Sequence, residues 1–214
     1  MNDSVNSYIC RYVVHIVLEC LSLHFRKIDM NEFREQFDNA RIALVQAKQI
    51  KKEFDTLFYN ESNQEIVRST ASTFFELVYA EFRESLIVKL CKLTDPKTQG
   101  NNANLSAEHI LNCTPVTEAA NFNTIKNIYD KRIVPYRRAL IRYRNKYAVH
   151  SDLTTLLSDE ERKPSDKVIM DLYDAVNDFY NEVSISVFKI TLSDDFYGYK
   201  NGADYLMHLL KNKV

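Results

Sequence analysis

Residues 29–58, DMNEFREQFDNARIALVQAKQIKKEFDTLF, decide the fold. Apolar residues recur in this stretch at steps of three or four, which places them along one side of a helix. They are Phe33, Phe37, Ala40, Leu44, Ala47, Ile50, Phe54, Leu57 and Phe58. Asp29 followed three residues later by Glu32 has the form of a capping box and marks the helix start. The stretch therefore predicts a long amphipathic helix that must pack against another element.

The next stretch offers that partner. A second long helix is predicted from Ser62, with Glu65 in the capping role. Its pattern runs through Ile66, Thr70, Phe74, Phe75, Val78, Phe82, Leu86, Leu90 and Leu93. Asp95-Pro96 ends it, because proline disfavours the helical conformation in the residue before it. Two long helices joined by a short turn are expected to lie antiparallel.

The rest of the chain also has helical spacing. We expect a first helix within residues 1–28, a short helix over 106–111, and a long segment from Glu118 to Tyr147 that Pro135 kinks or divides. Further helices are expected from Lys163–Ser165 to Val183 and over 203–211. The 3 Gly and 4 Pro in 214 residues leave few turns for a sheet. The prediction is one all-α domain over 1–214, with the helix of 1–28 packed on it and 193–214 as a C-terminal appendage.

Composition narrows the function. A hydrophobic fraction of 45% excludes a disordered chain, and a net charge of −1 excludes a uniformly basic nucleic-acid coat. No apolar run approaches the ~18 residues of a membrane span, and residues 1–7 lack the features of a signal peptide. We therefore expect a soluble cytoplasmic protein that makes no membrane contact. The 4 Cys have neither C-x-x-C nor zinc-finger spacing, so reduced core thiols and no metal or cofactor are expected.

Residues 142–152, RYRNKYAVHSD, gather the groups most able to do chemistry. Arg144 is followed directly by the polar Asn145, and His150 stands six residues after the arginine. Histidine is the side chain whose unperturbed pKa allows proton transfer near pH 7. The arginine fork matches a phosphate group. The pattern favours a site that holds a phosphate and moves a proton.

A local excess of positive charge leads into this motif. The basic residues are Lys126, Lys131, Arg132, Arg137, Arg138, Arg142, Arg144 and Lys146, with Asp130 the one acid among them. Tyr136, Tyr143 and Tyr147 are interleaved. Cations for phosphates and flat rings for bases suit single-stranded RNA, although such a run can equally be a solvated helix face with core tyrosines.

The helical geometry of the motif leaves three arrangements open. Successive residues turn by about 100°, so Arg144 and His150 lie about 240° apart on an ideal helix, whereas Lys146 and His150 share a face. Either the helix frays near Val149, or the long arginine reaches round, or a second chain completes the site.

Two stretches resemble the HEPN superfamily. Residues 144–150, RNKYAVH, resemble its motif of an arginine, a polar residue, a short spacer and a histidine. Residues 90–96, LCKLTDP, followed by a loop and then Asn104-Leu105-Ser106, resemble the AbiU-type branch, which is linked to abortive infection. The resemblance implies an all-α up-and-down bundle and a homodimer whose two motifs face one cleft. In active members it implies metal-independent cleavage of RNA, with a cyclic phosphate as product.

The resemblance also implies roles for individual residues. Arg144 corresponds to the phosphate clamp, Asn145 to the polar helper and His150 to the acid–base group. Side chains expected near the substrate are Lys146, Arg142, Arg138 and Tyr147, with Asp152 as a neighbour. HEPN toxins silenced by a partner nucleotidyltransferase tend to carry a tyrosine two residues after the histidine; Asp152 stands there instead, which argues against this form of control.

Three functions compete at this point. The first is a ribonuclease acting in phage defence or growth arrest, with a protein antitoxin left open as a partner. The second is an inactive HEPN-like dimer that binds RNA, a nucleotide or a protein, since many family members do not cleave RNA. The third is a helical partner protein in which Arg144 and His150 are structural.

Overall fold

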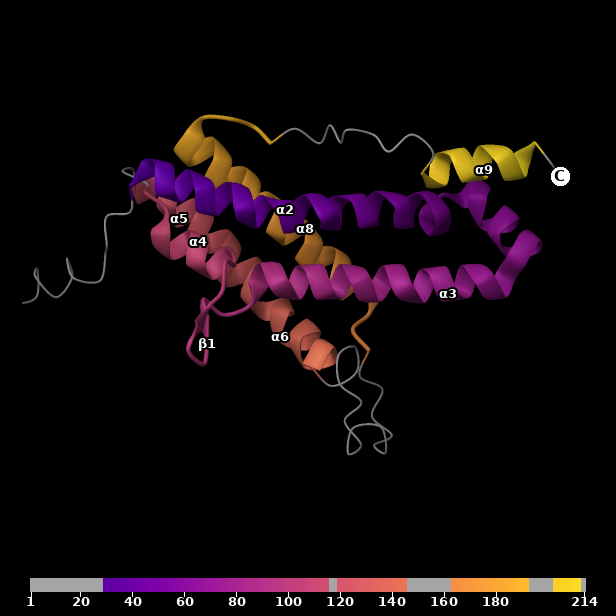
Figure 1. Ribbon diagram of the computed structural model, residues 1–214, viewed down its shortest axis with the longest axis horizontal. Coiled ribbons are helices and arrows are strands. Elements are labelled where there is room, and N and C mark those ends of the chain that lie inside the picture. Colours follow the sequence, from indigo (N-terminus) through magenta and orange to yellow (C-terminus); the bar gives the residue numbers. More distant parts are fainter. Residues whose placement is uncertain (1–28, 116–118, 146–162, 193–201, 213–214) are drawn as a thin grey trace, which may run out of the picture.

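The structure is a computed structural model that describes residues 29–115, 119–145, 163–192 and 202–212. Within these ranges the chain is a bundle of helices, and its strands are two pieces of two residues each (Figure 1). This confirms the prediction of an all-α fold. The predicted first helix, within residues 1–28, lies outside the described residues.

The two longest helices lie antiparallel along the length of the molecule (Figure 1). They are α2 (Met30–Phe54) and α3 (Glu61–Thr94), joined through a π-helical turn, η1 (Asp55–Tyr59). The carboxylate of Asp29 caps α2 by accepting a hydrogen bond from the backbone N–H of Asn31 at 3.2 Å. The predicted capping box at Ser62 is wrong, because α3 begins at Glu61 and Asn60 is its cap, accepting from the Ser62 N–H at 3.1 Å. Asparagine caps a helix as well as serine does.

A kink in α3 changes which aromatic residue is buried. Ala71 leaves the helical conformation with φ −159° and ψ 68°. Both Phe74 and Phe75 were predicted to face inward, yet Phe75 is 4% exposed and Phe74 is 58% exposed. The spacing of the apolar residues does not reveal this local break.

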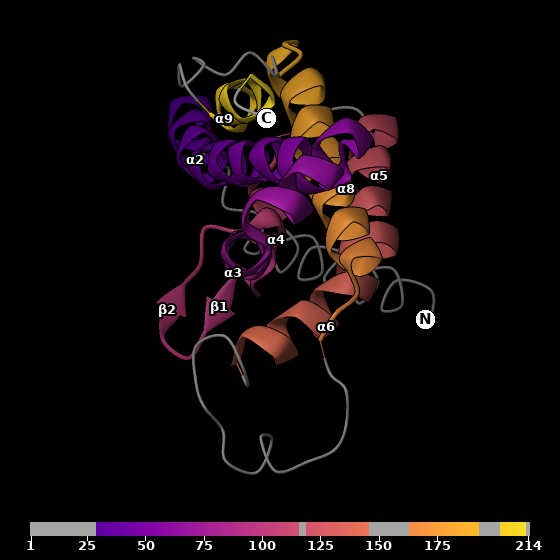
Figure 2. The same cartoon turned by 90° about the vertical axis from the view of Figure 1, so that its right-hand side faces the viewer.

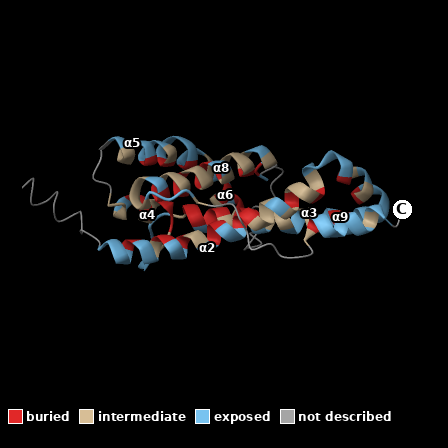
Figure 3. Ribbon diagram, turned by 90° about the horizontal axis from the view of Figure 1, so that it is seen from above, coloured by how far each residue is buried: buried red, intermediate tan, exposed pale blue. Residues whose placement is uncertain are grey.

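Shorter helices complete the bundle around one end of the α2–α3 pair. They are α4 (Ala107–Cys113), α5 (Ala119–Ile128), α6 (Val134–Tyr143) and α8 (Asp166–Val183), which continues into the π-helical turn η4 (Ser184–Phe188). Figure 3 shows the buried residues gathered where α2, α3, α6 and α8 face one another. Phe37 and Tyr180 meet there with ring centroids 5.7 Å apart. Each fully buried phenylalanine or leucine contributes about 1.5–3 kcal/mol, so this core holds the bundle together.

Pro135 divides the helical segment that leads to the motif. A π-helical turn, η2 (Tyr129–Ile133), stands between α5 and α6, and the N–H of Val134 bonds to the carbonyl of Tyr129, five residues back. Proline lacks an N–H and its ring crowds the preceding turn, which a widened turn accommodates. The prediction that Pro135 kinks or divides the helix is confirmed.

The last helix, α9 (Ala203–Lys211), packs against η1 and against the N-terminal half of α3 (Figure 1). Met207 and Ala203 form a small second core with Leu57, Val67 and Phe75. The carboxylate of Glu53 accepts the N–H of Ala203 at 2.5 Å, where a negative charge favours a helix N-terminus. A Cβ at Gly202 would lie 2.5 Å from this carboxylate, so a larger residue there would have to displace the end of the Glu53 side chain.

A small hairpin follows α3. Strands β1 (Thr98–Gln99) and β2 (Asn102–Ala103) pair antiparallel, and Gly100 between them has φ +60°, which glycine adopts at no steric cost. In Figure 2 the hairpin and α6 project on the same side of the bundle. The sequence predicted only a polar loop here, because strands of two residues leave no periodicity to detect.

Candidate functional site

Arg144 lies where α6 ends and reaches the end of α3. It follows Tyr143, the last residue of α6, and keeps a right-handed helical backbone with φ −52° and ψ −51°. Its Nη1 donates to Oδ1 of Asp95 at 2.9 Å and to Oδ2 at 2.8 Å. Both side chains are 14% exposed. The pair therefore brings together the two stretches that resemble the AbiU-type branch, 49 residues apart in the sequence.

Asn145 holds a second edge of the same guanidinium. Its Oδ1 accepts from Nε of Arg144 at 3.0 Å. Nη1 and Nε of Arg144 are thus engaged, and Nη2 has no acceptor among the described residues. The predicted polar helper is in contact with the predicted phosphate clamp, and the guanidinium is held at two of its three nitrogens.

Cys91 lies one helical turn before Asp95 and is buried. Burial raises the pKa of its thiol to about 12, although the positive charge of Arg144 works in the opposite direction. A thiol that stays protonated is not a nucleophile. Cys91 and Cys113 are both free, in agreement with reduced thiols; Cys10 and Cys20 lie outside the described residues.

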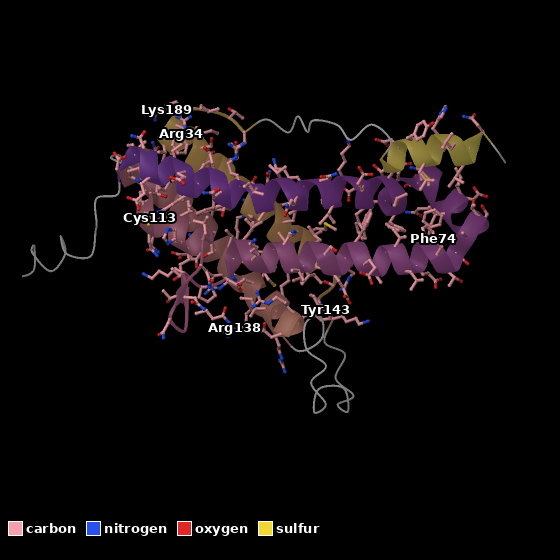
Figure 4. The ribbon with its side chains drawn as sticks, viewed as in Figure 1. Arg34, Phe74, Cys113, Arg138, Tyr143 and Lys189 are labelled. Carbon is pink, nitrogen blue, oxygen red and sulfur yellow. The ribbon has the colours of Figure 1, made fainter. Side chains whose placement is uncertain are left out.

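Tyr143 belongs to the core and not to an RNA-stacking surface. Tyr143, labelled in Figure 4, is 2% exposed. Its hydroxyl donates to Oε1 of Glu84 on α3 at 3.2 Å. The guanidinium carbon of Arg83 lies 5.9 Å from the centre of its ring. Burial, with the negative charge of Glu84, raises the pKa of Tyr143. The alternative of a core tyrosine is the correct one at this position.

The positive charge along α5 to α6 is more balanced than the sequence suggested. Four of the seven basic residues that the structure describes here have acidic partners. These pairs are Lys126–Asp130, Arg132–Asp178, Arg137–Glu108 and Arg144–Asp95. Arg138 and Arg142 are exposed four residues apart on α6, so they lie on one side of the helix, and Arg138 is labelled there in Figure 4. Ion pairs therefore interrupt the positive charge of this segment, which does not form a continuous strip.

The other predicted site residues lie outside the described residues. These are Lys146, Tyr147, His150 and the neighbouring Asp152. The three arrangements considered for Arg144 and His150 therefore stay open, as does a role for Tyr147 in stacking.

Asp95 is the member of the candidate site that the sequence pattern did not single out. Asp95-Pro96 was interpreted as a helix stop and as part of a resemblance, without a role for the carboxylate. The available signal was an acidic residue at the end of the stretch that accompanies the motif in the AbiU-type branch. Its partner could not be deduced, because the contact depends on how α6 crosses α3.

A second arginine–aspartate pair joins the start of α8 to α3. Nε of Arg83 donates to Oδ1 of Asp166 at 2.9 Å, with side-chain exposures of 12% and 29%. Asp166 also accepts from the hydroxyls of Tyr59, at 3.0 Å, and Tyr79. Burial together with this carboxylate raises the pKa of Tyr59 to about 12 and also raises that of Tyr79. Three side-chain donors thus converge on Asp166, and we call this group the clasp.

Metal and membrane sites have no counterpart in the part of the chain that the structure describes. No three His, Cys, Asp or Glu side chains converge there as metal ligands would. None of the described helices combines the length and the apolar character of a membrane span.

One comparison with known proteins agrees with the all-α fold. The model of a HEPN family described as AbiU2 matches residues 30–207, which is most of the chain. Neither a curated protein nor a solved structure matches.

Proposed function

The chain belongs to the AbiU2 family of HEPN domains, and from that premise we propose that it is a metal-independent endoribonuclease acting in phage defence or as a growth-arrest toxin. The family makes it a HEPN-like protein associated with abortive infection. The proposal goes further in naming the reaction and the residues that carry it.

One observation supports the enzyme most directly, namely the orientation of Arg144. Asp95 and Asn145 hold Nη1 and Nε at 2.8–3.0 Å, while Nη2 has no acceptor among the described residues. A guanidinium fixed before substrate arrives can stabilise charge on a phosphate without reorganising in the transition state. Arg138 and Arg142, exposed on α6, supply further cations for the flanking phosphates.

The reaction needs no group beyond RNA and side chains. His150 accepts the proton of the 2′-hydroxyl, whose oxygen attacks the adjacent phosphorus. The bond from phosphorus to the 5′ oxygen breaks, and that oxygen takes a proton from a second acid. The products are a 2′,3′-cyclic phosphate and a 5′-hydroxyl. Arg144 stabilises the charge that builds on the non-bridging oxygens.

A homodimer supplies the second histidine in this proposal. HEPN domains commonly dimerise, and two motifs facing one cleft would provide one histidine as base and the other as acid. Sedimentation should then show a dimer at micromolar concentration. A monomer that cleaves RNA at full rate would remove the composite site.

Cleavage of single-stranded RNA by the wild type and by His150→Ala tests the mechanism. Loss of a general acid–base group should slow cleavage by about 10²–10⁴-fold with an unchanged melting temperature. His208→Ala, an exposed histidine on α9, is the matched control and should cleave at the wild-type rate. EDTA should leave cleavage intact. Activity abolished by EDTA and restored by Mg²⁺ would show the Arg–His mechanism to be wrong.

A second candidate is an inactive HEPN-like dimer that binds RNA, a nucleotide or a protein partner. The observation in its favour is that Asp95 neutralises much of the charge of Arg144 in a site where both are 14% exposed. This candidate predicts a wild type that does not cleave RNA, and a His150→Ala variant that binds RNA as the wild type does.

A further inference from the structure

The hairpin after α3 fixes the backbone around Asp95. The N–H of Asp95 closes the last turn of α3 on the carbonyl of Cys91 at 2.8 Å. On the far side of Pro96, Asn104 donates through Nδ2 to the Pro96 carbonyl at 2.8 Å and through its backbone N–H to the Lys97 carbonyl, also at 2.8 Å. The residues flanking Asp95 are therefore held from both directions along the chain.

Two other helices hold the same segment. Glu108 on α4 accepts the N–H of Lys97 at 3.3 Å. Nη1 of Arg137 on α6 donates to the carbonyl of Thr94 at 3.4 Å and to the hydroxyl of Tyr129 at 2.7 Å. The backbone that carries Asp95 is therefore fixed by contacts with α3, α4 and α6. We expect the Arg144 side chain to take its orientation from the Asp95 carboxylate.

We propose that Asp95 is the positioning residue of the site: it sets the direction of the Arg144 guanidinium so that Nη2 points to the scissile phosphate. This inference rests on the proposed function, which it deepens by giving a purpose to the hairpin over 98–103. The carboxylate uses both of its oxygens on Nη1, at 2.9 and 2.8 Å, and leaves Nη2 for the substrate. It touches no substrate itself and acts through Arg144.

The geometry indicates that Asp95 orients Arg144 and does not compete with the substrate phosphate for it. A carboxylate that occupied the phosphate position would engage two different nitrogens of the fork, as a phosphate does. Asp95 binds one nitrogen, and Asn145 binds Nε on the other side. The substrate can therefore bind without displacing Asp95. The negative charge nearby should weaken ground-state binding slightly, while the fixed orientation favours the transition state.

The test is a double-mutant cycle between Asp95→Asn and Arg144→Ala, measured as kcat and KM on single-stranded RNA. Asp95→Asn should lower kcat on the order of 10–10²-fold, because misdirected groups lose that much rate, and should leave KM unchanged or lower. In the Arg144→Ala background the same change should have no further effect. Asp38→Asn, at the exposed Arg41–Asp38 pair of α2, is the charge-matched control and should match the wild type.

If Asp95→Asn folds poorly, a second variant, Asp95→Glu, replaces it. Melting curves then give the folded fraction, so that kcat can be compared per folded molecule. Glutamate retains the charge but displaces the guanidinium, so kcat per folded molecule should fall less than with asparagine. Equal kcat in wild type and Asp95→Asn would overturn the inference. So would a loss of rate that appears equally with and without Arg144, since Asp95 would then be structural.

Failure of the proposed function gives a different result. If the wild type does not cleave RNA, the enzyme proposal fails, and affinity for an uncleavable 2′-O-methyl RNA replaces kcat. Asp95→Asn should then bind this RNA a few-fold more tightly, because a neutral amide no longer offsets the charge of Arg144. The gain should vanish with Arg144→Ala. A change in affinity that is independent of Arg144 would overturn the positioning role on its own.

Discussion

Two arginine–aspartate pairs attach other helices to α3, and they differ in how many side chains hold the aspartate. Asp166 accepts from Arg83, Tyr59 and Tyr79, and Arg83 also donates through Nη2 to the carbonyl of Pro164. Among the described side chains Asp95 accepts from Arg144 alone, and Asn145 accepts from Nε of that arginine. The two arginines are 12% and 14% exposed, so burial does not distinguish them.

We interpret the difference as that between a structural contact and a candidate ligand site. An aspartate held by three side chains joins the elements that carry them, whereas one that holds a single arginine sets the position of that arginine. Arg83–Asp166 fixes the start of α8. Arg144–Asp95 fixes the guanidinium of Arg144 beside the motif. Variants of the two pairs should therefore differ in RNA cleavage per folded molecule.

The largest effect is expected from exchanging each arginine for alanine. Arg144→Ala should slow RNA cleavage per folded molecule on the order of 10²–10³-fold by removing charge stabilisation. It should also destabilise the fold by about 1–3 kcal/mol, because it leaves the Asp95 carboxylate, which is 14% exposed, without its arginine. Arg83→Ala should destabilise the fold through Asp166 in the same way but keep the wild-type rate per folded molecule. Cleavage assays and thermal melts on both variants measure this contrast.

Arg144→Lys sharpens the same comparison. A lysine restores the charge, but a single ammonium group cannot bond to Asp95, Asn145 and a phosphate in the planar arrangement of the guanidinium, so it should recover only part of the lost rate. The comparison breaks if the cleavage rate of Arg144→Ala falls only with its folded fraction. Both pairs would then be structural.

A smaller effect concerns the pH dependence of stability at the clasp. Burial alone would raise the pKa of Asp166, but hydrogen bonds from Tyr79, Arg83 and Tyr59 outweigh it and hold the pKa below the ordinary 3.8. Because the folded pKa lies below the unfolded one, this carboxylate stabilises the fold above pH 3.8, and the contribution is lost as pH falls through the folded pKa. Melting temperatures of wild type and Asp166→Asn should therefore differ at pH 7 and converge toward pH 3.

Asp174→Asn is the control of opposite sign. Asp174 is exposed on α8, and its partial desolvation raises its pKa, so its ionisation does not add stability to the fold as that of Asp166 does. The asparagine variant should be as stable as the wild type at pH 7, or more so. A loss of stability at pH 7 in this variant, equal to that of Asp166→Asn, would contradict the assignment.

Periodicity predicted the fold because the fold is governed by burial of apolar faces. The apolar seam from Phe33 to Phe54 is buried as its spacing required, and so are the inward residues of α8. The failures lie where a local break overrides the pattern. Ala71 kinks α3 and leaves Phe74 exposed, and Asn60 in place of Ser62 caps that helix. A single residue at a break carries no periodic signal.

The site was less accessible to sequence reasoning than the fold. The motif identified Arg144 and Asn145, which the structure joins at 3.0 Å. It did not identify Asp95, since a contact over 49 residues depends on the crossing of α6 and α3. It also treated the basic residues as one strip, although Arg132 and Arg137 pair with acids on α8 and α4. Charge counted along the sequence omits partners contributed by the rest of the fold.

The smallest effect is expected from Tyr143→Phe. This variant tests whether the pairs Arg83–Asp166 and Arg144–Asp95 are coupled. Tyr143 directly precedes Arg144, and its ring lies 5.9 Å from the guanidinium carbon of Arg83. The variant keeps that ring and removes only the hydroxyl that donates to Glu84 at 3.2 Å. The fold should lose about 0.5–1.5 kcal/mol, the usual net contribution of one hydrogen bond. RNA cleavage per folded molecule should stay at the wild-type rate, because the direction of Arg144 depends on Asp95 and Asn145.

Tyr143→Ala is the contrasting variant, because it removes the ring as well. Truncating a buried aromatic residue costs about 3–5 kcal/mol, and the end of α6 would lose its packing on α3. That variant should lower both the melting temperature and kcat. Suppose that Tyr143→Phe slows cleavage tenfold while its melting temperature falls only as expected. The hydrogen bond from the Tyr143 hydroxyl to Glu84 must then help to orient the Arg144 side chain. The clasp and the site would then form one coupled network along α3, and the distinction between them would fail.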